Sequence, residues 1–175
     1  ANNETGVLAP IEAVSDAATR VGALRFVDMT QCVGKGDAEP LAKYADIMVC
    51  SSHKIYGPKG AGALIASRHV QRKLVPLASG GGQERGLRGG TQNTAGIAGF
   101  GVAAEIAAKE QSSDNARLAD LSTALLTGLN DRLNDVELNT GTASRLSNTL
   151  NLRFVGADAE AVMASMPFNG LPIEP

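Results

Sequence analysis

The feature that most constrains the fold of this chain is an apolar run that passes directly into a polar, glycine-rich segment. Residues 47–49 are Ile-Met-Val, and residues 51–60 read Ser-Ser-His-Lys-Ile-Tyr-Gly-Pro-Lys-Gly. A short apolar run bounded by turn residues is typical of a buried β-strand. The sequence therefore predicts a strand that ends in a loop carrying two hydroxyls, an imidazole and the amine of Lys54.

Strand and helix patterns alternate along the first part of the chain. A helix is predicted from Pro10 to Val21, because apolar residues recur there at helical spacing after a starting proline. Short strands are predicted at residues 24–27, 46–50 and 63–66. Such alternation is typical of an α/β fold with a largely parallel sheet.

The rest of the chain predicts mainly helix. An alanine-rich helix is expected at residues 94–110, followed by a break or cap at residues 112–115. Five leucines at helical spacing, which we interpret as one core face, are Leu118, Leu121, Leu125, Leu129 and Leu133. A strand is predicted at residues 149–154, and then a helix capped by Asp158. Residues 167–175 carry three prolines and are expected to be extended or disordered.

The composition argues against nucleic acid or a membrane as partner. The 175 residues have a net charge of -2, 3% aromatic residues and no Trp, whereas nucleic-acid-binding surfaces are basic and often aromatic. No apolar run reaches the roughly 20 residues of a membrane span, and no signal peptide is recognisable. Cys32 and Cys50 form no Cys-x-x-Cys pair, which favours a reducing compartment, so we expect a cytoplasmic protein. Because the chain starts at Ala1, we expect it to be part of a longer protein.

Two polar loops are expected at the same edge of the sheet. Asp28 follows one predicted strand and Ser51 follows the next, and ligands of open α/β sheets bind at the carboxyl ends of strands. A carboxylate suits a protonated ring nitrogen, the Lys54 amine suits an aldehyde, and hydroxyl and imidazole groups suit a phosphate. Together they predict pyridoxal phosphate, whose ring withdraws electrons from a substrate. A capping role for Asp28 and a plain surface position for Lys54 are the structural alternatives.

Other site classes fit the sequence less well. Gly34-Lys35 lacks the upstream glycine and the following hydroxyl residue of a phosphate-binding loop. A zinc site made of His53, Cys32 and Cys50 would have unsuitable spacing. No Ser-His-Asp arrangement can be assembled, because the only other histidine, His69, is interpreted as a solvated residue at a helix start.

Four motifs in register carry a resemblance to a known family. They are Asn-Asn-Glu-Thr-Gly at residues 2–6, Val-Asp-x-x-Gln at 27–31, Ser-x-His-Lys-x-Tyr-Gly-Pro-Lys-Gly at 51–60, and Gly-Gly-Gly-Gln-Glu-Arg-Gly-Leu-Arg-Gly-Gly-Thr at 80–91. From Ala1 to about Pro167 the chain resembles the cysteine desulfurases among the fold-type I pyridoxal phosphate enzymes. The fourth motif resembles their iron–sulfur and nitrogen-fixation type.

The resemblance implies a role for seven residues. Lys54 would hold the cofactor as a Schiff base and move protons, and Asp28 would bind the pyridine nitrogen. Gln31 would bind the ring hydroxyl, and Ser51 and His53 would bind the phosphate. Thr91 would reach the phosphate of the partner subunit's cofactor, and Asn3 would help to hold the substrate carboxylate. A homodimer follows from the resemblance as well.

The resemblance also implies a fold and an activity. The fold would be α/β, with residues 1–91 as the C-terminal half of the cofactor-binding large domain, 92–134 as connecting helices, 135–167 as part of a small α+β C-terminal domain and 168–175 as an atypical tail. The activity would convert L-cysteine to L-alanine and transfer the sulfur to an enzyme cysteine as a persulfide. An iron–sulfur scaffold or another sulfur acceptor would be the partner.

The sequence departs from the family pattern at the sulfur-accepting position. In the family, the nucleophilic cysteine lies shortly after the position of Met166, where this sequence has none, and a ring-stacking histidine comes from a segment before Ala1. We interpret Cys32 and Cys50 as buried small apolar residues. We therefore expect that this chain alone does not complete desulfuration. Another fold-type I enzyme, such as a selenocysteine lyase or an aminotransferase, and a non-catalytic dimerising module are the alternatives.

Overall fold

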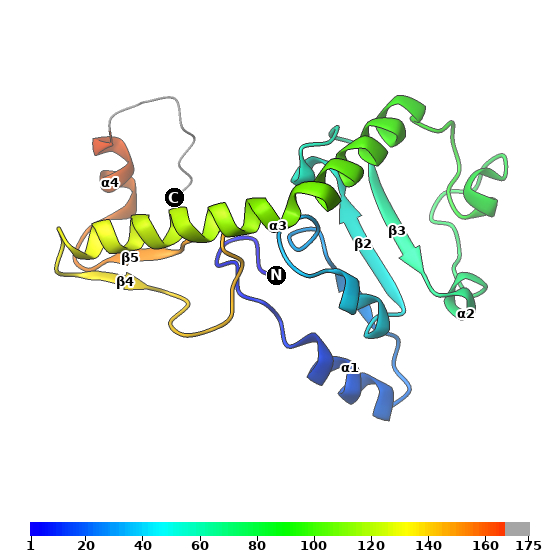
Figure 1. Cartoon of the computed structure of the whole chain (residues 1–175). Helices are drawn as coiled ribbons and strands as arrows, with labels where there is room; N and C mark the ends of the chain where they lie inside the picture. The colour runs from blue at the N-terminus through cyan, green and yellow to red at the C-terminus, as the bar shows by residue number, and fades with distance from the viewer. Residues whose placement is uncertain (167–175) are drawn as a thin grey trace.

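The computed structural model describes residues 1–166, apart from the side chain of Glu39. These residues form a small sheet with short helices and a second, smaller module, which are connected by the long helix α3 (Thr94–Asn130) (Figure 1). The tail predicted at residues 168–175, and the extended or disordered run predicted at 167–175, lie outside the described residues. No helix in the described part of the chain is long and apolar enough to cross a membrane.

The sheet has the order β1-β2-β3, formed by β1 (Phe26–Asp28), β2 (Ile47–Ser51) and β3 (Gly62–Ala66). β1 pairs with β2 in parallel, whereas β3 pairs with β2 in the antiparallel direction. The expected largely parallel sheet is thus parallel in only one of these two pairings. The reason is the short connection between β2 and β3, which contains only the 3₁₀ turn η2 (Ser52–Ile55), whereas a parallel crossover needs about a dozen residues or more.

Helix α1 (Ile11–Arg20) begins directly after Pro10, as predicted. Arg25 links α1 to the sheet. The buried Asp46 fixes this side chain, because it accepts hydrogen bonds from the Arg25 backbone N–H, Nε and Nη2, each at 2.9 Å. Arg25 Nη1 also donates to Ser15 Oγ of α1 at 3.1 Å. The hydrogen bonds from Arg25 hold the pKa of Asp46 well below its ordinary value. This cluster lies at the amino ends of β1 and β2.

Short helical turns fill the connections between these elements. They are η1 (Glu39–Lys43), α2 (Arg68–Gln71) and η3 (Gln83–Gly86). His69 lies in the first turn of α2, and its side chain is 60% exposed, which confirms the expected solvated position. Its Nε2 is also 3.6 Å from Asp46 Oδ1, a contact that the sequence did not indicate.

The long helix α3 replaces the two helices that the sequence predicted. Asn93 caps its first turn by accepting a hydrogen bond from the Gly96 N–H at 3.0 Å. The predicted break at residues 112–115 is wrong. Ser113 Oγ donates to the carbonyl of Glu110 at 2.9 Å, and a hydroxyl satisfied in this way is compatible with a continuous helix that bends. Figure 1 shows that α3 does bend along its length.

The smaller module consists of β4 (Val136–Leu138), the antiparallel β5 (Leu152–Phe154) and α4 (Ala159–Ser165). The predicted cap of α4 is confirmed, because the Asp158 side chain accepts a hydrogen bond from the Ala161 N–H at 3.0 Å. The N-terminal segment also joins this module, since the Leu146 N–H donates to the carbonyl of Gly6 at 2.9 Å.

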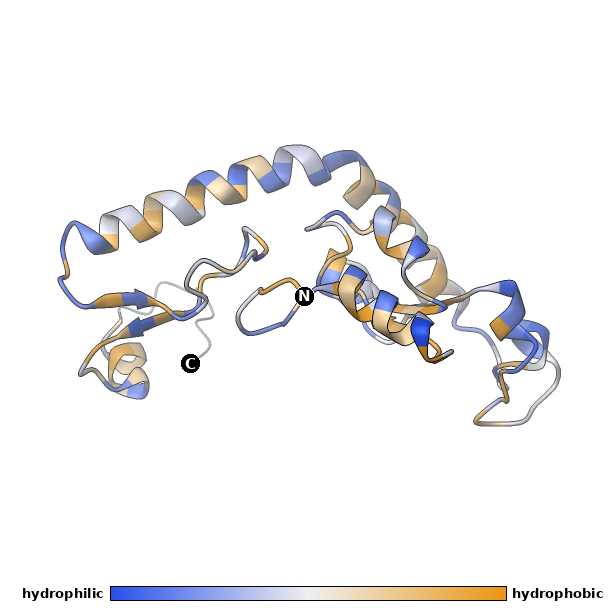
Figure 2. Cartoon of the chain, turned by 90° about the horizontal axis from the view of Figure 1, so that it is seen from below, coloured by the Kyte–Doolittle hydropathy of each residue, from blue (hydrophilic) through white to orange (hydrophobic). Residues whose placement is uncertain are grey.

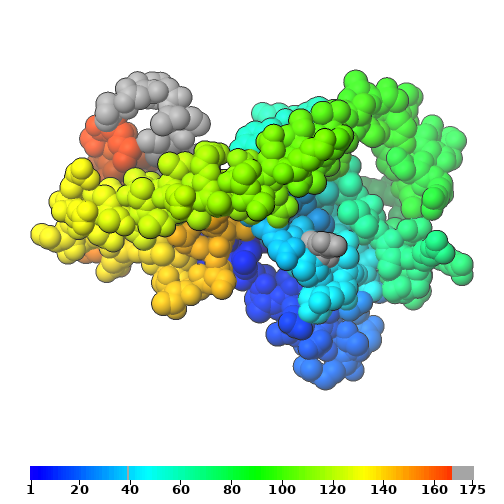
Figure 3. All heavy atoms as spheres, viewed as in Figure 1, coloured from blue at the N-terminus to red at the C-terminus, as the bar shows by residue number. Residues whose placement is uncertain are grey.

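The core lies where the sheet, η2 and α3 meet. Its buried apolar residues include Val27 of β1, Cys50 of β2, Ile55 of η2 and Ala103 of α3. Figure 3 shows α3 as a continuous ridge that reaches from this core to the smaller module. The first half of α3 is therefore in a position to affect the loops at the sheet edge.

The predicted leucine core face is only partly covered. Leu121 and Leu125 are each 54% exposed, and Leu133 lies beyond the end of α3 and is 45% exposed. Figure 2 shows apolar and polar residues interspersed along this half of the helix. Within the described residues, the prediction of a buried face is wrong for these three side chains, because the two short strands β4 and β5 offer too little surface to cover them.

Candidate active site

Two loops that follow β1 and β2 form the candidate site. Asp28, the last residue of β1, is aligned with Val49 of β2, and the Met29 N–H donates to the carbonyl of Val49 at 2.9 Å. β2 ends two residues later at Ser51, and the Lys54 turn (residues 52–57) follows. Because β1 and β2 are parallel, Asp28 and the Lys54 turn lie at the same edge of the sheet.

Asp28 is held in its ionised form by a neighbour in its own loop. Thr30 hydrogen-bonds the carboxylate, and its backbone N–H lies 2.9 Å from Asp28 Oδ1. The side-chain and backbone hydrogen bonds of Thr30 lower the pKa of Asp28. An exposed carboxylate that stays ionised is suited to bind a protonated ring nitrogen.

The backbone of the Lys54 turn closes on itself. The carbonyl of Ser52 accepts hydrogen bonds from the N–H groups of Tyr56 and Gly57, the latter at 3.1 Å. Tyr56 adopts a left-handed φ of 64°. A Cβ on Gly57 would collide with Ser52 Oγ, so the closure of the turn requires glycine at this position.

Two buried residues anchor the Lys54 turn to the core. Ser52 is fully buried and Ile55 is 5% exposed, whereas Lys54 is half-buried and His53 is exposed. Among the described residues, no carboxylate forms an ion pair with Lys54. The turn is therefore anchored by its buried side, while its two basic residues remain accessible.

A second lysine, which the sequence analysis did not assign to the site, lies in the β1 turn (residues 29–36). Lys35 is half-buried, and burial, followed by the positive charge of Lys54, lowers its pKa. The sequence contains a signal for this proximity, because Lys35 follows Gln31 in the turn after β1, at the same edge as Lys54.

Gln31 and the N-terminal segment that carries Asn3 lie on the side of the site formed by the β1 turn. Gln31 is half-buried within this turn. Asn3 is exposed in the N-terminal segment, which approaches the same turn through a 3.4 Å hydrogen bond from the Ala1 amino group to Cys32 Sγ. The structure thus brings Asp28, Gln31 and the Lys54 turn to one edge, with the segment of Asn3 beside it.

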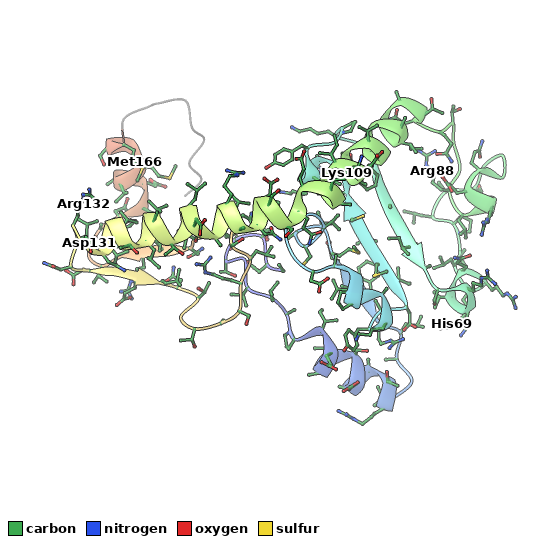
Figure 4. All side chains as sticks on the ribbon, viewed as in Figure 1. His69, Arg88, Lys109, Asp131, Arg132 and Met166 are labelled. Atoms are coloured by element: carbon green, nitrogen blue, oxygen red, sulfur yellow. The ribbon has the colours of Figure 1, made fainter. Side chains whose placement is uncertain are left out.

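Thr91 lies in a loop separate from the two loops of the candidate site. It is exposed in the loop between α2 and α3, where Arg88 Nη1 donates to the carbonyls of Gly90 and Thr91 at 2.9 and 3.1 Å. Figure 4 shows Arg88 on this loop, beyond β3. Within the part of the chain that the structure describes, no hydrogen bond joins Thr91 to the Lys54 turn.

Both cysteines are free and buried, which confirms their interpretation as small core residues. Burial raises the pKa of Cys50, and the nearby charge of Asp28 raises it further. A buried thiol that stays protonated is a poor nucleophile. In residues 1–166, no group of three or more His, Cys, Asp or Glu side chains is arranged to hold a metal ion.

The residues at this edge fit pyridoxal phosphate in their chemistry. Asp28 offers an ionised carboxylate to the ring nitrogen, and Lys54 offers an accessible amine to the aldehyde. Ser51 and His53 lie at the end of β2 and in the turn after it, and their hydroxyl and imidazole groups suit a phosphate.

Comparisons with known proteins give a consistent set of relatives. Residues 1–173 match the aminotransferase class-V family. The chain is 49% identical over 169 residues to a cysteine desulfurase of Frankia sp. (strain EuIK1). The aligned region covers 95% of this chain and 40% of that protein. It is 39% identical over 165 residues to the mitochondrial cysteine desulfurase of Arabidopsis thaliana, covering 94% of this chain and 36% of that protein.

A solved structure shows the same fold. The NifS-like protein from Rickettsia africae ESF-5 superimposes with a TM-score of 0.80 at 32% identity, over 92% of this chain and 44% of that chain. The chain spans about two fifths of the length of the curated relatives named above.

Proposed function

The chain belongs to the aminotransferase class-V family, and we propose that the protein carrying it is a pyridoxal-phosphate-dependent cysteine desulfurase. The observation that carries this proposal is the common sheet edge at which the ionised Asp28 and the accessible Lys54 lie. The relatives named cysteine desulfurase support it. Because the chain spans about two fifths of these relatives, the activity, the substrate and the partners are all part of the proposal.

Asp28 and Lys54 have the central roles in this proposal. Pyridoxal phosphate, when bound, supplies an electron sink for negative charge on the substrate α-carbon. Asp28 keeps a proton on the ring nitrogen by accepting its hydrogen bond. Lys54 holds the cofactor covalently and moves a proton to or from the substrate carbon atoms.

The remaining residues bind and orient. Ser51 and His53 bind the phosphate, and Gln31 contacts the ring hydroxyl. Asn3 contacts the substrate carboxylate from the N-terminal segment. Thr91 contacts the phosphate in the other protomer of a homodimer, which gives its separate, exposed loop a function.

The substrate in this proposal is L-cysteine. Its sulfur passes to the thiolate of an enzyme cysteine, so that the substrate C–S bond breaks, a persulfide S–S bond forms, and protonation of the substrate carbon yields L-alanine. Cys32 and Cys50 are not proposed as the acceptor, because both are buried. The protein works in the cytoplasm and passes its sulfur to an acceptor protein such as an iron–sulfur scaffold.

Turnover of L-cysteine tests this function. The full-length protein that carries this chain, given pyridoxal phosphate, L-cysteine and a thiol reductant, should release sulfide and alanine in equal amounts. Lys54→Ala should lower the rate by roughly 10³-fold or more, whereas Lys59→Ala, on the same loop, should keep it. Transamination without sulfide release, or selenide release from L-selenocysteine with no sulfide release from L-cysteine, would favour the other fold-type I enzymes. No turnover by a folded, dimeric protein would favour a non-catalytic module.

A further inference from the structure

The first half of α3 contacts both loops of the candidate site through residues spaced by four. Gly99, Ala103, Ala107 and Gln111 therefore lie along one face of the helix. We propose that these four residues, the α3 row, are positioning residues that set the placement of Asp28 relative to Lys54. The inference rests on the proposed function, because it concerns the same site.

Two members of the α3 row contact the Lys54 turn and the proline that follows it. A Cβ on Gly99 would lie 2.7 Å from Cγ of Pro58, and a Cβ on Gly57 would lie 3.0 Å from Cβ of Ala103. Ala103 is itself buried, with 8% exposure. The backbone of α3 and the backbone of residues 57–58 lie too close together for larger side chains at these positions. The helix therefore packs directly against the Lys54 turn.

The other two members contact the β1 turn. A Cβ on Gly34 would lie 3.2 Å from Cβ of Ala107 and 3.1 Å from Cγ2 of Ile55, which belongs to the Lys54 turn. Gln111 Nε2 donates to the carbonyl of Gly36 at 2.7 Å, although 75 residues separate the two in sequence. Gly34 thus lies against both the helix and the Lys54 turn.

Both site loops therefore rest on one rigid element. Each step of four residues along a helix rises about 6 Å. The α3 row therefore holds the Lys54 turn and the β1 turn at fixed, successive positions along the helix axis. Val102 and Ile106, which lie off the row, are 58% and 48% exposed. Breaking the hydrogen bond between Gln111 and Gly36 should make the β1 turn more mobile. Asp28, which precedes this turn, should then no longer be held in a fixed position relative to Lys54.

The test compares two variants of the full-length protein. Gln111→Glu is nearly isosteric, removes the donor to Gly36 and places a carboxylate against its carbonyl. Ser112→Glu adds the same charge at the next position, which is exposed. Hydrogen exchange is measured without cofactor over residues 29–37 and over β4 and β5, and pyridoxal phosphate affinity is measured by absorbance titration.

We expect Gln111→Glu to speed exchange over residues 29–37 and to weaken pyridoxal phosphate binding, each by roughly tenfold. Exchange in β4 and β5 should stay unchanged, which separates a local positioning role from general destabilisation. Ser112→Glu should remain within about twofold of the unsubstituted protein. Ala107→Leu, with the exposed Ala116→Leu as its control, should reproduce the weaker cofactor binding.

The outcomes separate this inference from the proposed function. Equal exchange over residues 29–37 in Gln111→Glu and Ser112→Glu overturns the inference, and so does equal pyridoxal phosphate affinity. If the unsubstituted protein does not bind pyridoxal phosphate, the proposed function fails. Faster exchange throughout the protein in Gln111→Glu assigns Gln111 to general stability and overturns its positioning role.

Discussion

At the scale of single residues, the charge of Asp28 depends on a neighbour two positions along the chain. Thr30 hydrogen-bonds the carboxylate through its side chain and backbone and lowers the pKa of Asp28. The sequence places Asp28 at a strand end, and an Asp followed by a hydroxyl residue is a common turn pattern. The site residue was thus predictable, whereas its electrostatic state required the geometry of the turn.

Thr30→Ala should raise the pKa of Asp28 toward that of an ordinary carboxyl group. The variant removes the side-chain hydrogen bond and leaves the backbone N–H in place. Since the folded-state pKa is lowered, this interaction stabilises the protein above the ordinary carboxyl pKa and is lost as the pH falls through the folded-state pKa. An NMR titration of the Asp28 carboxyl carbon measures the change, with the exposed Thr127→Ala as control. An identical titration curve in Thr30→Ala contradicts this account of the charge.

Gly57→Ala should destabilise the protein by roughly 2 kcal/mol, because the added methyl group would collide with Ser52 Oγ and crowd Ala103. Gly101→Ala is the matched control. It lies in α3 with nothing within 4 Å of the added Cβ, so it should stabilise the protein by about 0.5–1 kcal/mol. Denaturant unfolding of both variants measures the difference. Equal changes in the free energy of unfolding for the two variants would mean that the close approach of Gly57 to Ser52 does not hold the Lys54 turn closed.

At the scale of elements, local pattern predicted most of the short elements well, did not predict β4, and predicted the long helix poorly. α1, β1, β2, β3 and α4 all lie close to their predicted positions. The polar residues 112–115 suggested a break, but a polar segment continues a helix when its side chains reach solvent or the preceding turn, as Ser113 does. The direction of β3 depends on the length of the β2–β3 connection rather than on strand pattern.

The link between α1 and the sheet should depend on Asp46. Asp46→Ala leaves Arg25 without its partner and should lower the Tm by several degrees, because Asp46 is buried. Glu137→Ala removes an exposed ion pair with Arg153 and should change the Tm little.

This effect of Asp46 should also depend on pH. Arg25 lowers the folded-state pKa of Asp46, so the pair stabilises the protein above the ordinary carboxyl pKa. The difference in Tm between Asp46→Ala and the unsubstituted protein should therefore shrink as the pH falls below about 4. A difference that stays constant on acidification would show that the carboxylate charge is not what links α1 to the sheet.

At the scale of the whole molecule, the sequence predicted which loops meet at the sheet edge, because parallel strands place their carboxyl ends together. It did not reveal Lys35 or the α3 row. These residues reach the site through packing between segments far apart in sequence, such as Gln111 and Gly36. The positions of Asn3 and Thr91 relative to a bound substrate and a second protomer are likewise properties of an assembled protein and stay predictions.

Covalent mapping of the cofactor tests the central claim most directly. The full-length protein is incubated with pyridoxal phosphate, reduced with borohydride and digested, and the labelled peptide is identified by mass spectrometry. We predict a visible absorbance band before reduction and a label on Lys54, with both lost in Lys54→Ala. A label that resides on Lys35 or another lysine in the unsubstituted protein, or a spectrum that Lys54→Ala leaves unchanged, would contradict the assignment of the site.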